Sequence, residues 1–225
     1  MTDATERRSI RLINPNSDSR ATERMLVAAR AAAPDWLRID GSTTAASPRL
    51  IVDDSGSALA TRAVIDDSNR TTDHGDGVIL SAFVDPGIDH MRQRLGVPVV
   101  GIGESSMREA AAIGRFAVLM TTPGLIDCVR RYATALGLTE RLVAIPGTTE
   151  DPQTLMADAD RLVAALDELI RRTVRDDGAE AVVVGGGPLA DAARTLAPTS
   201  PVPLIEPVPA AVRRMVAALS RGDAA

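Results

Sequence analysis

A glutamate stands at the end of a short apolar run in the last part of the sequence. In PLIEPVPAA, Glu206 directly follows Pro, Leu and Ile. A carboxylate at the end of an apolar strand loses part of its hydration, and in that setting it can serve as a general acid or base. The alternative is that Glu206 caps the helix that follows. Glu206 is therefore the first candidate for proton transfer.

Two other segments place polar side chains where a strand ends and a helix begins. TTPG offers the hydroxyls of Thr121 and Thr122 beside free backbone N–H groups, which suits a carboxylate or another anion. INPNS offers the amides of Asn14 and Asn16 in the matching position of the first half. The structural alternatives are a threonine helix cap and an Asx turn followed by a serine cap. We expect all four residues to contact the substrate.

A glycine-rich loop, GGGP, follows a run of valines and contains Gly185, Gly186 and Gly187. It lacks the G-x-G-x-x-G spacing of a dinucleotide-binding loop. Glycines let a ligand approach the backbone closely, and N–H groups there could stabilise an oxyanion or an enolate. The alternative is a tight turn without a binding role.

The other side chains of chemical interest are predicted to be structural. The only cysteine, Cys128, falls on the apolar face of an expected helix, so we expect a buried, unreactive thiol. Glu104 and Asp85 are predicted as cap and turn residues. His74 and His90 have no partner at metal-ligand spacing, and we expect both at the surface and no metal site.

A fold of alternating strands and helices must position these residues. Amphipathic patterns predict helices that include 19–33, 87–95, 152–175 and 207–220. This alternation predicts an α/β fold with parallel sheets covered by helices on both faces. Runs rich in Val and Ile predict the strands, at 10–14, 37–41, 77–82, 97–102, 116–121, 142–145, 181–185 and 202–206.

The two halves of the sequence contain similar segments in the same order. SIRLINPN corresponds to RFAVLMTT, GVILSAFVDPG to AVVVGGGPLAD, and VPVVGI to VPLIEP, at offsets of 106, 104 and 105 residues. Such constant offsets indicate a duplicated α/β unit of about half the chain. In open α/β sheets the ligand lies at the carboxyl ends of the strands, and the candidate residues fall there in both halves.

The amino-acid composition limits the classes of molecule that the protein is expected to bind. A net charge of −5 and only one Trp, one Tyr and two Phe disfavour nucleic acid. The sequence has no lysine, which excludes a P-loop lysine and a Schiff-base lysine. The first residues lack the apolar stretch of a signal peptide, and no segment approaches the ~18 apolar residues of a membrane span. We expect a cytoplasmic protein with no nucleic-acid or membrane partner.

Five motifs in order resemble the hydantoin racemases of the aspartate/glutamate racemase superfamily. They are IRLINPNS, FVDPG, VPVVGIGESSMREAA, RFAVLMTTPG and VPLIEPVPAAV, and the resemblance covers essentially the whole chain. It implies one racemase-like unit over 1–225, made of two pseudo-symmetric parallel-sheet lobes, about 1–114 and 115–225, with the active site between them. It also implies that no cofactor is needed. We expect a homo-oligomer.

The chain departs from this family at the catalytic residues. In the family a cysteine from each lobe forms a pair, in which one thiolate removes the α-proton and the opposite thiol returns one to the other face. The first cysteine would directly precede Phe83, where this chain has Ala82, and the second would fall at Gly186. Cys128 replaces neither, because it belongs inside a helix. Ala82 and Phe83 are therefore predicted to contact the substrate, without a thiol mechanism.

These observations predict a cofactor-independent isomerase or lyase that acts on a small carboxylate or a cyclic amide by acid/base proton transfer without thiols. Glu206 is the first candidate. Ser81 is a secondary one, because alternation along the strand points it away from the cleft if position 82 points into it. The alternative is a catalytically retired protein that binds or senses a small anion. Exchange of a substrate α-hydrogen in deuterated water would distinguish the two.

Overall fold

The computed structural model describes residues 7–71, 74–147, 158–185 and 189–222. They form two compact units. The first takes the described residues of Met1–Ile51, Ser55–Ile102 and Val208–Ala225, and the second takes those of Val52–Asp54 and Gly103–Pro207. Neither unit is continuous in sequence, whereas the sequence predicted continuous lobes divided after residue 114. The C-terminal helix belongs with the first unit.

The first unit is built on a parallel sheet that has, in the described part of the chain, four strands in the order β2-β1-β3-β4. Central β1 pairs with β2 and β3, so that Ile10 lies opposite both Ile39 and Gly77. The strands are β1 (Arg8–Asn14), β2 (Leu37–Thr43), β3 (Gly77–Leu80) and β4 (Val99–Gly101). The helices are α1 (Ser19–Ala32), α2 (Asp54–Arg70), α3 (Ile88–Arg94) and α9 (Pro207–Gly222).

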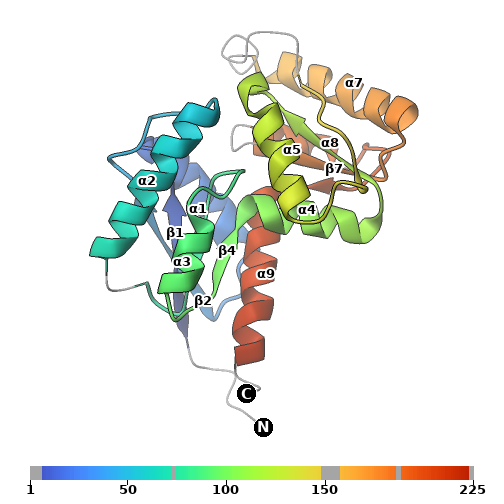
Figure 1. Cartoon of the computed structure of the whole chain (residues 1–225). Coiled ribbons are helices and arrows are strands. Elements are labelled where there is room, and N and C mark those ends of the chain that lie inside the picture. Colours follow the sequence, from blue (N-terminus) through green and yellow to red (C-terminus); the bar gives the residue numbers. More distant parts are fainter. Residues whose placement is uncertain (1–6, 72–73, 148–157, 186–188, 223–225) are drawn as a thin grey trace. The chain divides into compact units, whose positions relative to one another are not determined.

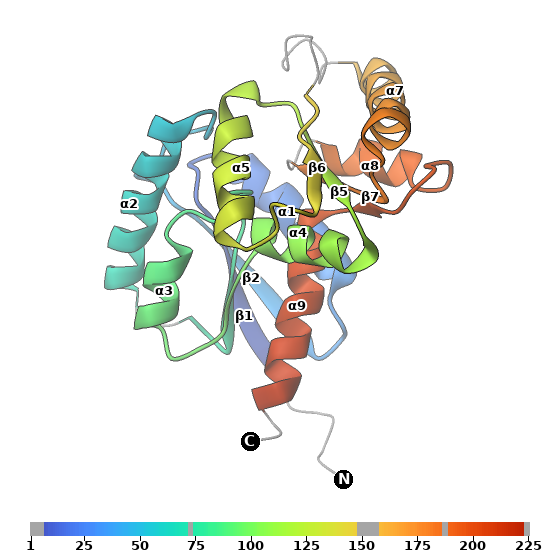
Figure 2. The same ribbon diagram turned by 45° about the vertical axis from the view of Figure 1, so that its right-hand side comes forward.

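Side chains alternate across this sheet and give it two apolar faces. Ile10 and Leu12 of β1 pack with residues of α1 and α9, whereas Ile13 packs with residues of α2 and α3. The side chains of β3 alternate in the same way. Ile79 packs in the cluster with Ile10 and Leu12, and Val78 packs in the cluster with Ile13. Figures 1 and 2 show α2 and α3 side by side. The sheet is covered by helices on both faces, which explains why its strands read as apolar runs.

The second unit repeats this plan. Its sheet, again counted over the described residues, has four parallel strands in the order β6-β5-β7-β8. One apolar cluster joins β5 and β7 to α7 and α8 through Leu119, Val184, Leu166 and Ala193. The strands are β5 (Phe116–Met120), β6 (Leu142–Ala144), β7 (Ala181–Gly185) and β8 (Leu204–Ile205). The helical segments are α4 (Ile102–Ile113), the 3₁₀ turn η1 (Pro123–Leu125), α5 (Ile126–Ala135), α7 (Ala159–Asp177) and α8 (Ala190–Leu196).

The two sheets have the same topology, because β1, β2, β3 and β4 occupy the places that β5, β6, β7 and β8 occupy in the other. This confirms the predicted α/β fold with two pseudo-symmetric parallel-sheet lobes. The strands are shorter at some ends than the apolar runs suggested. The predicted strand 97–102 ends at Gly101, because Ile102 already begins α4. Residues 152–157 of one predicted helix lie outside the described residues.

Across the described helices, none combines the length and the apolar character that a membrane crossing requires.

Candidate active site

The carboxyl end of β1 carries a dense hydrogen-bond network around Asn14, which is fully buried. Its Nδ2 lies 2.8 Å from Oδ1 of Asn16 and 3.0 Å from Oγ1 of Thr22, and its Oδ1 accepts from the backbone N–H of Asn16 at 3.1 Å. Oγ1 of Thr22 also lies 2.6 Å from Oγ1 of Thr43 at the end of β2. The Asn14 amide thus fixes the shape of this loop, and half-buried Asn16 is its more accessible member.

The cap of the helix that follows differs from the serine cap weighed from the sequence. The structure places Asp18 at this position, where its Oδ1 accepts a hydrogen bond from the backbone N–H of Arg20 at 3.0 Å. The carboxylate is also the better partner for the positive end of the helix dipole. INPNS therefore forms the turn before α1, and Asp18 starts the helix.

The carboxyl end of β3 presents Ala82 and Phe83, and it turns Ser81 inward. Ser81 is 3% exposed, and its hydroxyl donates to the sulfur of Met25 on α1 at 2.8 Å. This direction agrees with the alternation argument that made Ser81 a secondary candidate. Ala82 is half-buried and Phe83 is buried. The backbone then turns, with the N–H of Asp85 donating to the carbonyl of Ala82 at 2.9 Å.

The carboxyl end of β5 presents two hydroxyls. Thr121 is buried and Thr122 is half-buried. Thr122 precedes η1, but its side chain makes no capping hydrogen bond, so the cap alternative does not account for this hydroxyl. Neither threonine hydroxyl is engaged by another described residue. As far as the described residues go, both hydroxyls can donate to an anion beside the N-terminus of η1 and α5.

The glycine loop begins at Gly185, the last residue of β7, where a Cβ would meet the carbonyl oxygen of Leu119 at 3.0 Å. This close approach of two backbones explains the glycine at that position. Gly186 and Gly187 lie outside the described residues. Their predicted role in substrate binding stays a prediction.

Glu206 follows β8 directly and meets a cation. Its side chain is 23% exposed, and Nη2 of Arg194 on α8 lies 3.0 Å from its Oε2. That oxygen is buried and makes no well-oriented hydrogen bond in the described part of the chain, so the contact is an ion pair without hydrogen-bond geometry. Nη1 of Arg194 reaches Oδ1 of Asp191 at 3.2 Å. Sequence reasoning did not single out Arg194, because nothing local links it to Glu206.

Cys128 is not buried in an apolar surface as the sequence predicted. It is half-buried, and its thiol donates to Oδ1 of Asp54 at 2.6 Å, while Nη2 of Arg131 lies 3.5 Å from the sulfur. Burial and the Asp54 carboxylate raise the pKa of Cys128 to about 11. Hydrogen bonds from Cys128 and then Arg131 lower the pKa of Asp54. The thiol therefore stays protonated near neutral pH and is a poor nucleophile.

The prediction of a surface position is wrong for His74, which is 8% exposed because the turn before β3 folds its ring inward. His90 is half-buried, with Nε2 lying 3.4 Å from Oδ1 of Asn69. Glu104, predicted as a cap residue, lies in the first turn of α4 and pairs with Arg108, whose Nε lies 2.7 Å from Oε1 of the glutamate. Within the described residues, no group of three His, Cys, Asp or Glu side chains is arranged to hold a metal ion.

Comparisons with known proteins agree with the fold. Residues 10–215 match the family model described as Asp/Glu/Hydantoin racemase. The hydantoin racemase of Paenarthrobacter aurescens is 28% identical over 207 residues, which cover 91% of this chain and 88% of that protein. The allantoin racemase of Pseudomonas fluorescens superposes with a TM-score of 0.89 at 25% identity, over 95% of this chain and 92% of that one. The allantoin racemase of Klebsiella pneumoniae gives a TM-score of 0.84 at 28% identity, over 95% and 88% of the two chains. With the duplicated sheets, these matches show that the chain belongs to the Asp/Glu/hydantoin racemase family.

Proposed function

We propose that this protein is an enzyme that moves a proton at a carbon next to a carbonyl group, in a small carboxylate or a cyclic amide. It does so by acid/base chemistry without thiols and without a cofactor. The observation that carries the proposal is the carboxylate of Glu206, held 3.0 Å from Arg194 at the end of β8. Position 82 holds alanine, and this carboxylate is a proton-transfer group that directly follows a strand.

Glu206 acts first as the base. The guanidinium of Arg194, whose Nη2 lies 3.0 Å from Oε2, holds the Glu206 carboxylate in place after β8. The substrate C–H bond breaks, its proton moves to a Glu206 oxygen, and its electron pair passes into the carbonyl to form an enolate. The proton on Glu206 then exchanges with water. Return of a solvent-derived proton to the same carbon gives hydrogen exchange, and its delivery to the other face or to another carbon gives an isomer. In a lyase reaction, loss of carbon dioxide would create the same enolate, and a protonated Glu206 would quench it.

The hydroxyls of Thr121 and Thr122 bind the carboxylate or carbonyl of the substrate. Donors placed where negative charge develops stabilise an enolate more than its neutral precursor. The N–H groups of the loop 185–187 would add to this stabilisation. In the first unit, Asn16, Ala82 and Phe83 stay predicted substrate contacts, and Asn14 fixes the loop that carries Asn16. Ser81 remains a secondary candidate, since its hydroxyl would have to leave the sulfur of Met25 to reach a substrate.

The substrate class follows from the names of the relatives. A hydantoin racemase and two allantoin racemases are among the similar proteins, and both names denote cyclic ureides. A ring of this kind offers an acidic C–H group beside a carbonyl, together with imide groups for the threonine hydroxyls. We therefore propose a cyclic amide of this type before an open-chain carboxylate.

A second candidate function is a catalytically retired protein that binds a small anion or imide. The observation that favours it is the loss of reactive thiols. Position 82 holds alanine, and the one cysteine has its pKa raised to about 11 by burial and by Asp54. Such a protein would retain the threonine hydroxyls that bind the ligand but would not catalyse a reaction.

Hydrogen exchange tests the proposal. The protein is incubated with a 5-substituted hydantoin in deuterated water, and loss of the ring C–H signal is followed by proton NMR. We expect exchange with the natural chain and a loss of about 10²- to 10⁴-fold in Glu206→Gln, the usual contribution of a general base. Glu140→Gln, at an exposed glutamate of the same unit, is the control and should exchange normally.

The outcomes separate the candidates. Equal exchange in Glu206→Gln and the natural chain would show that Glu206 is not the base. Calorimetric binding of the hydantoin without exchange would instead establish the retired binding protein.

We further propose that the chain of 225 residues works as one racemase-like unit and assembles into a homo-oligomer. Leu50 and Leu59 are 60% and 51% exposed, and contact with a second copy would cover them. Light scattering coupled to size-exclusion chromatography tests the assembly. A mass equal to a single chain at micromolar concentration would contradict it.

A further inference from the structure

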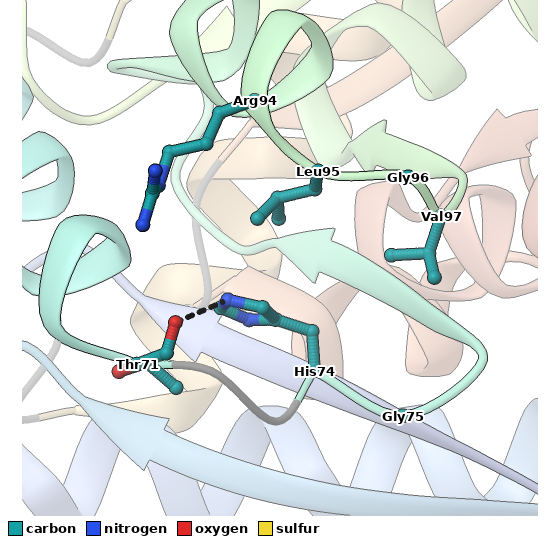
Figure 3. A pocket seen from close by; sticks show the side chains of 7 residues that line it. All are labelled: Thr71, His74, Gly75, Arg94, Leu95, Gly96 and Val97. Atoms are coloured by element: carbon teal, nitrogen blue, oxygen red, sulfur yellow. Dashed lines mark hydrogen bonds between the residues drawn. The ribbon is translucent and has the colours of Figure 1, made fainter.

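A pocket of about 390 Å³ lies in the first unit, in front of the amino ends of β3 and β4. Asn14 ends β1 and Ala82 follows β3 at the carboxyl edge of the first sheet, so this pocket lies at the opposite edge of that sheet. Its volume falls within the range of small-molecule sites. It is lined by Thr71, His74, Gly75, Arg94, Leu95, Gly96 and Val97 (Figure 3).

The pocket contains a buried histidine whose second nitrogen is unsatisfied. His74 is 8% exposed, and its Nε2 lies 3.0 Å from the carbonyl oxygen of Thr71. A carbonyl can only accept, so Nε2 carries the proton and Nδ1 presents a lone pair. Nδ1 is buried and has no hydrogen-bond partner among the residues that the structure describes. Because an unpaired buried acceptor destabilises the fold, a ligand that donates to it gains that energy.

Arg94 supplies the complementary donor. Its Nε and Nη2 donate to the backbone carbonyls of Ser68 and Asn69 near the end of α2, at 3.3 and 3.2 Å. These two bonds hold the guanidinium at the edge of the pocket. No described residue engages the remaining Nη1. Figure 3 shows the side chains of Arg94, Leu95 and His74 directed toward the same space.

The donor on Arg94 and the acceptor on His74 determine which chemical class of ligand the pocket can bind. A carboxylate or phosphate would accept from Arg94 but would face the lone pair of Nδ1, because the ring proton lies on Nε2 against the Thr71 carbonyl. An amide or ureide offers both an N–H group and a carbonyl on neighbouring atoms. The apolar side chains of Leu95 and Val97 would contact the body of such a molecule.

We propose that this pocket is a second binding site, which takes a small uncharged amide or ureide. The ligand N–H donates to Nδ1 of His74, and the ligand carbonyl accepts from Nη1 of Arg94. The assignment rests on His74 and Arg94 alone, so it stands or falls independently of the proposed catalytic function.

The sequence makes a direct test possible, because the chain has only two histidines. The full chain is labelled with ¹⁵N-histidine and titrated with hydantoin, chosen because it carries N–H groups next to carbonyls. His74→Gln assigns the resonances. We expect the Nδ1 resonance of His74 to move in a saturable way while the signals of His90 stay in place. The probe 1,3-dimethylhydantoin has no N–H group and should leave the His74 resonance unmoved, as should acetate at neutral pH.

Variants test the second contact. Arg94→Gln should weaken the hydantoin titration at His74 about tenfold, because it removes the charged donor. Arg62→Gln, at an exposed arginine of α2, should leave the titration unchanged. Glu206→Gln should also retain it, which separates this site from the proposed active site.

Three results would overturn the proposal. They are an unmoved His74 resonance at saturating hydantoin, an equal response to the dimethylated probe, and loss of the response in Glu206→Gln.

Discussion

Glu206 and Cys128 have neighbours of opposite charge. Nη2 of Arg194 lies 3.0 Å from Oε2 of Glu206. Cys128 donates to the carboxylate of Asp54, which together with burial raises the pKa of the thiol to about 11. The thiol is therefore protonated near neutral pH and engaged with Asp54, which makes it a poor nucleophile.

The reactivity of Cys128 follows from that pKa. Alkylation by iodoacetamide at pH 8 should be about a hundredfold slower in the folded chain than in the urea-unfolded chain, where the pKa is near 9.0. Asp54→Asn should raise the folded-state rate, because it removes the negative charge. Mass spectrometry of timed samples measures both rates. Equal rates in folded and unfolded protein would contradict the assignment. Cys128→Ala should leave any exchange activity intact.

The same pKa shift makes stability depend on pH. The pKa of Cys128 is higher in the folded than in the unfolded chain, so the protonated thiol stabilises the fold fully below about pH 9. This stabilisation is lost as the pH rises through about 11. Urea unfolding of the natural chain and of Cys128→Ala across this interval should show the loss in the natural chain alone. Parallel curves would show that the shift is absent.

Thr121 tests the proposed anion contact. Its hydroxyl has no partner among the described residues, so Thr121→Val removes the proposed ligand contact without breaking a bond to any of them. A hydrogen bond to a charged group contributes ~1.5–3 kcal/mol, so affinity for the substrate should fall about ten- to over a hundredfold. Isothermal titration calorimetry measures the change. Thr134→Val, at an exposed threonine of α5, is the control and should bind normally. Unchanged affinity in Thr121→Val would place the site elsewhere.

At the scale of elements, a tight junction joins β4 to α4. Gly101 ends the strand and Ile102 begins the helix, with no loop between them. The carboxylate of Asp85, from the turn after β3, packs against Gly101 where a Cβ would stand. Asp85 itself has φ of 46°, an uncommon value for a residue with a side chain. The glycine and the strained aspartate together fix how the turn after β3 meets the end of β4.

This junction predicts that a side chain at position 101 destabilises the fold. Gly101→Ala should lower the free energy of unfolding by about 1–3 kcal/mol, because the new methyl group collides with the Asp85 carboxylate. Gly96→Ala is the matched control, since a Cβ there meets nothing within 4 Å. Its effect should stay within about 1 kcal/mol. Urea unfolding followed by circular dichroism compares the two. A stable Gly101→Ala variant would show that the Asp85 side chain can move aside at little cost.

At the scale of the whole molecule, duplication is the dominant feature. Both sheets share one strand order, and family membership extends over residues 10–215. The units are nevertheless not successive halves of the chain. Val208, Val212 and Met215 of α9 pack with the first sheet, although α9 follows the last strand of the second.

The family relationship makes a gain-of-function prediction. Ala82→Cys combined with Gly186→Cys should introduce the thiol pair that the resemblance implies, and low racemisation of a hydantoin should appear. Each single variant should give at most one-sided proton exchange. Chiral chromatography measures the racemisation, and circular dichroism with thermal melting must first show a folded protein. A folded double variant that binds the hydantoin without exchange would show that positions 82 and 186 do not correspond to the family cysteines.

The sequence by itself determined the alternation of strands and helices, the duplication, the family and the absence of cysteine at positions 82 and 186. These features are local or repeated patterns, so apolar periodicity and motif order suffice to find them. Only the tertiary structure decided which charges meet. It placed Arg194 against Glu206, buried His74, and brought Asp54 to Cys128 across 74 residues of sequence. Asp54 and Cys128 come from distant segments, and Arg194 and Glu206 from different elements, so these side chains become neighbours only when the helices pack on the sheets.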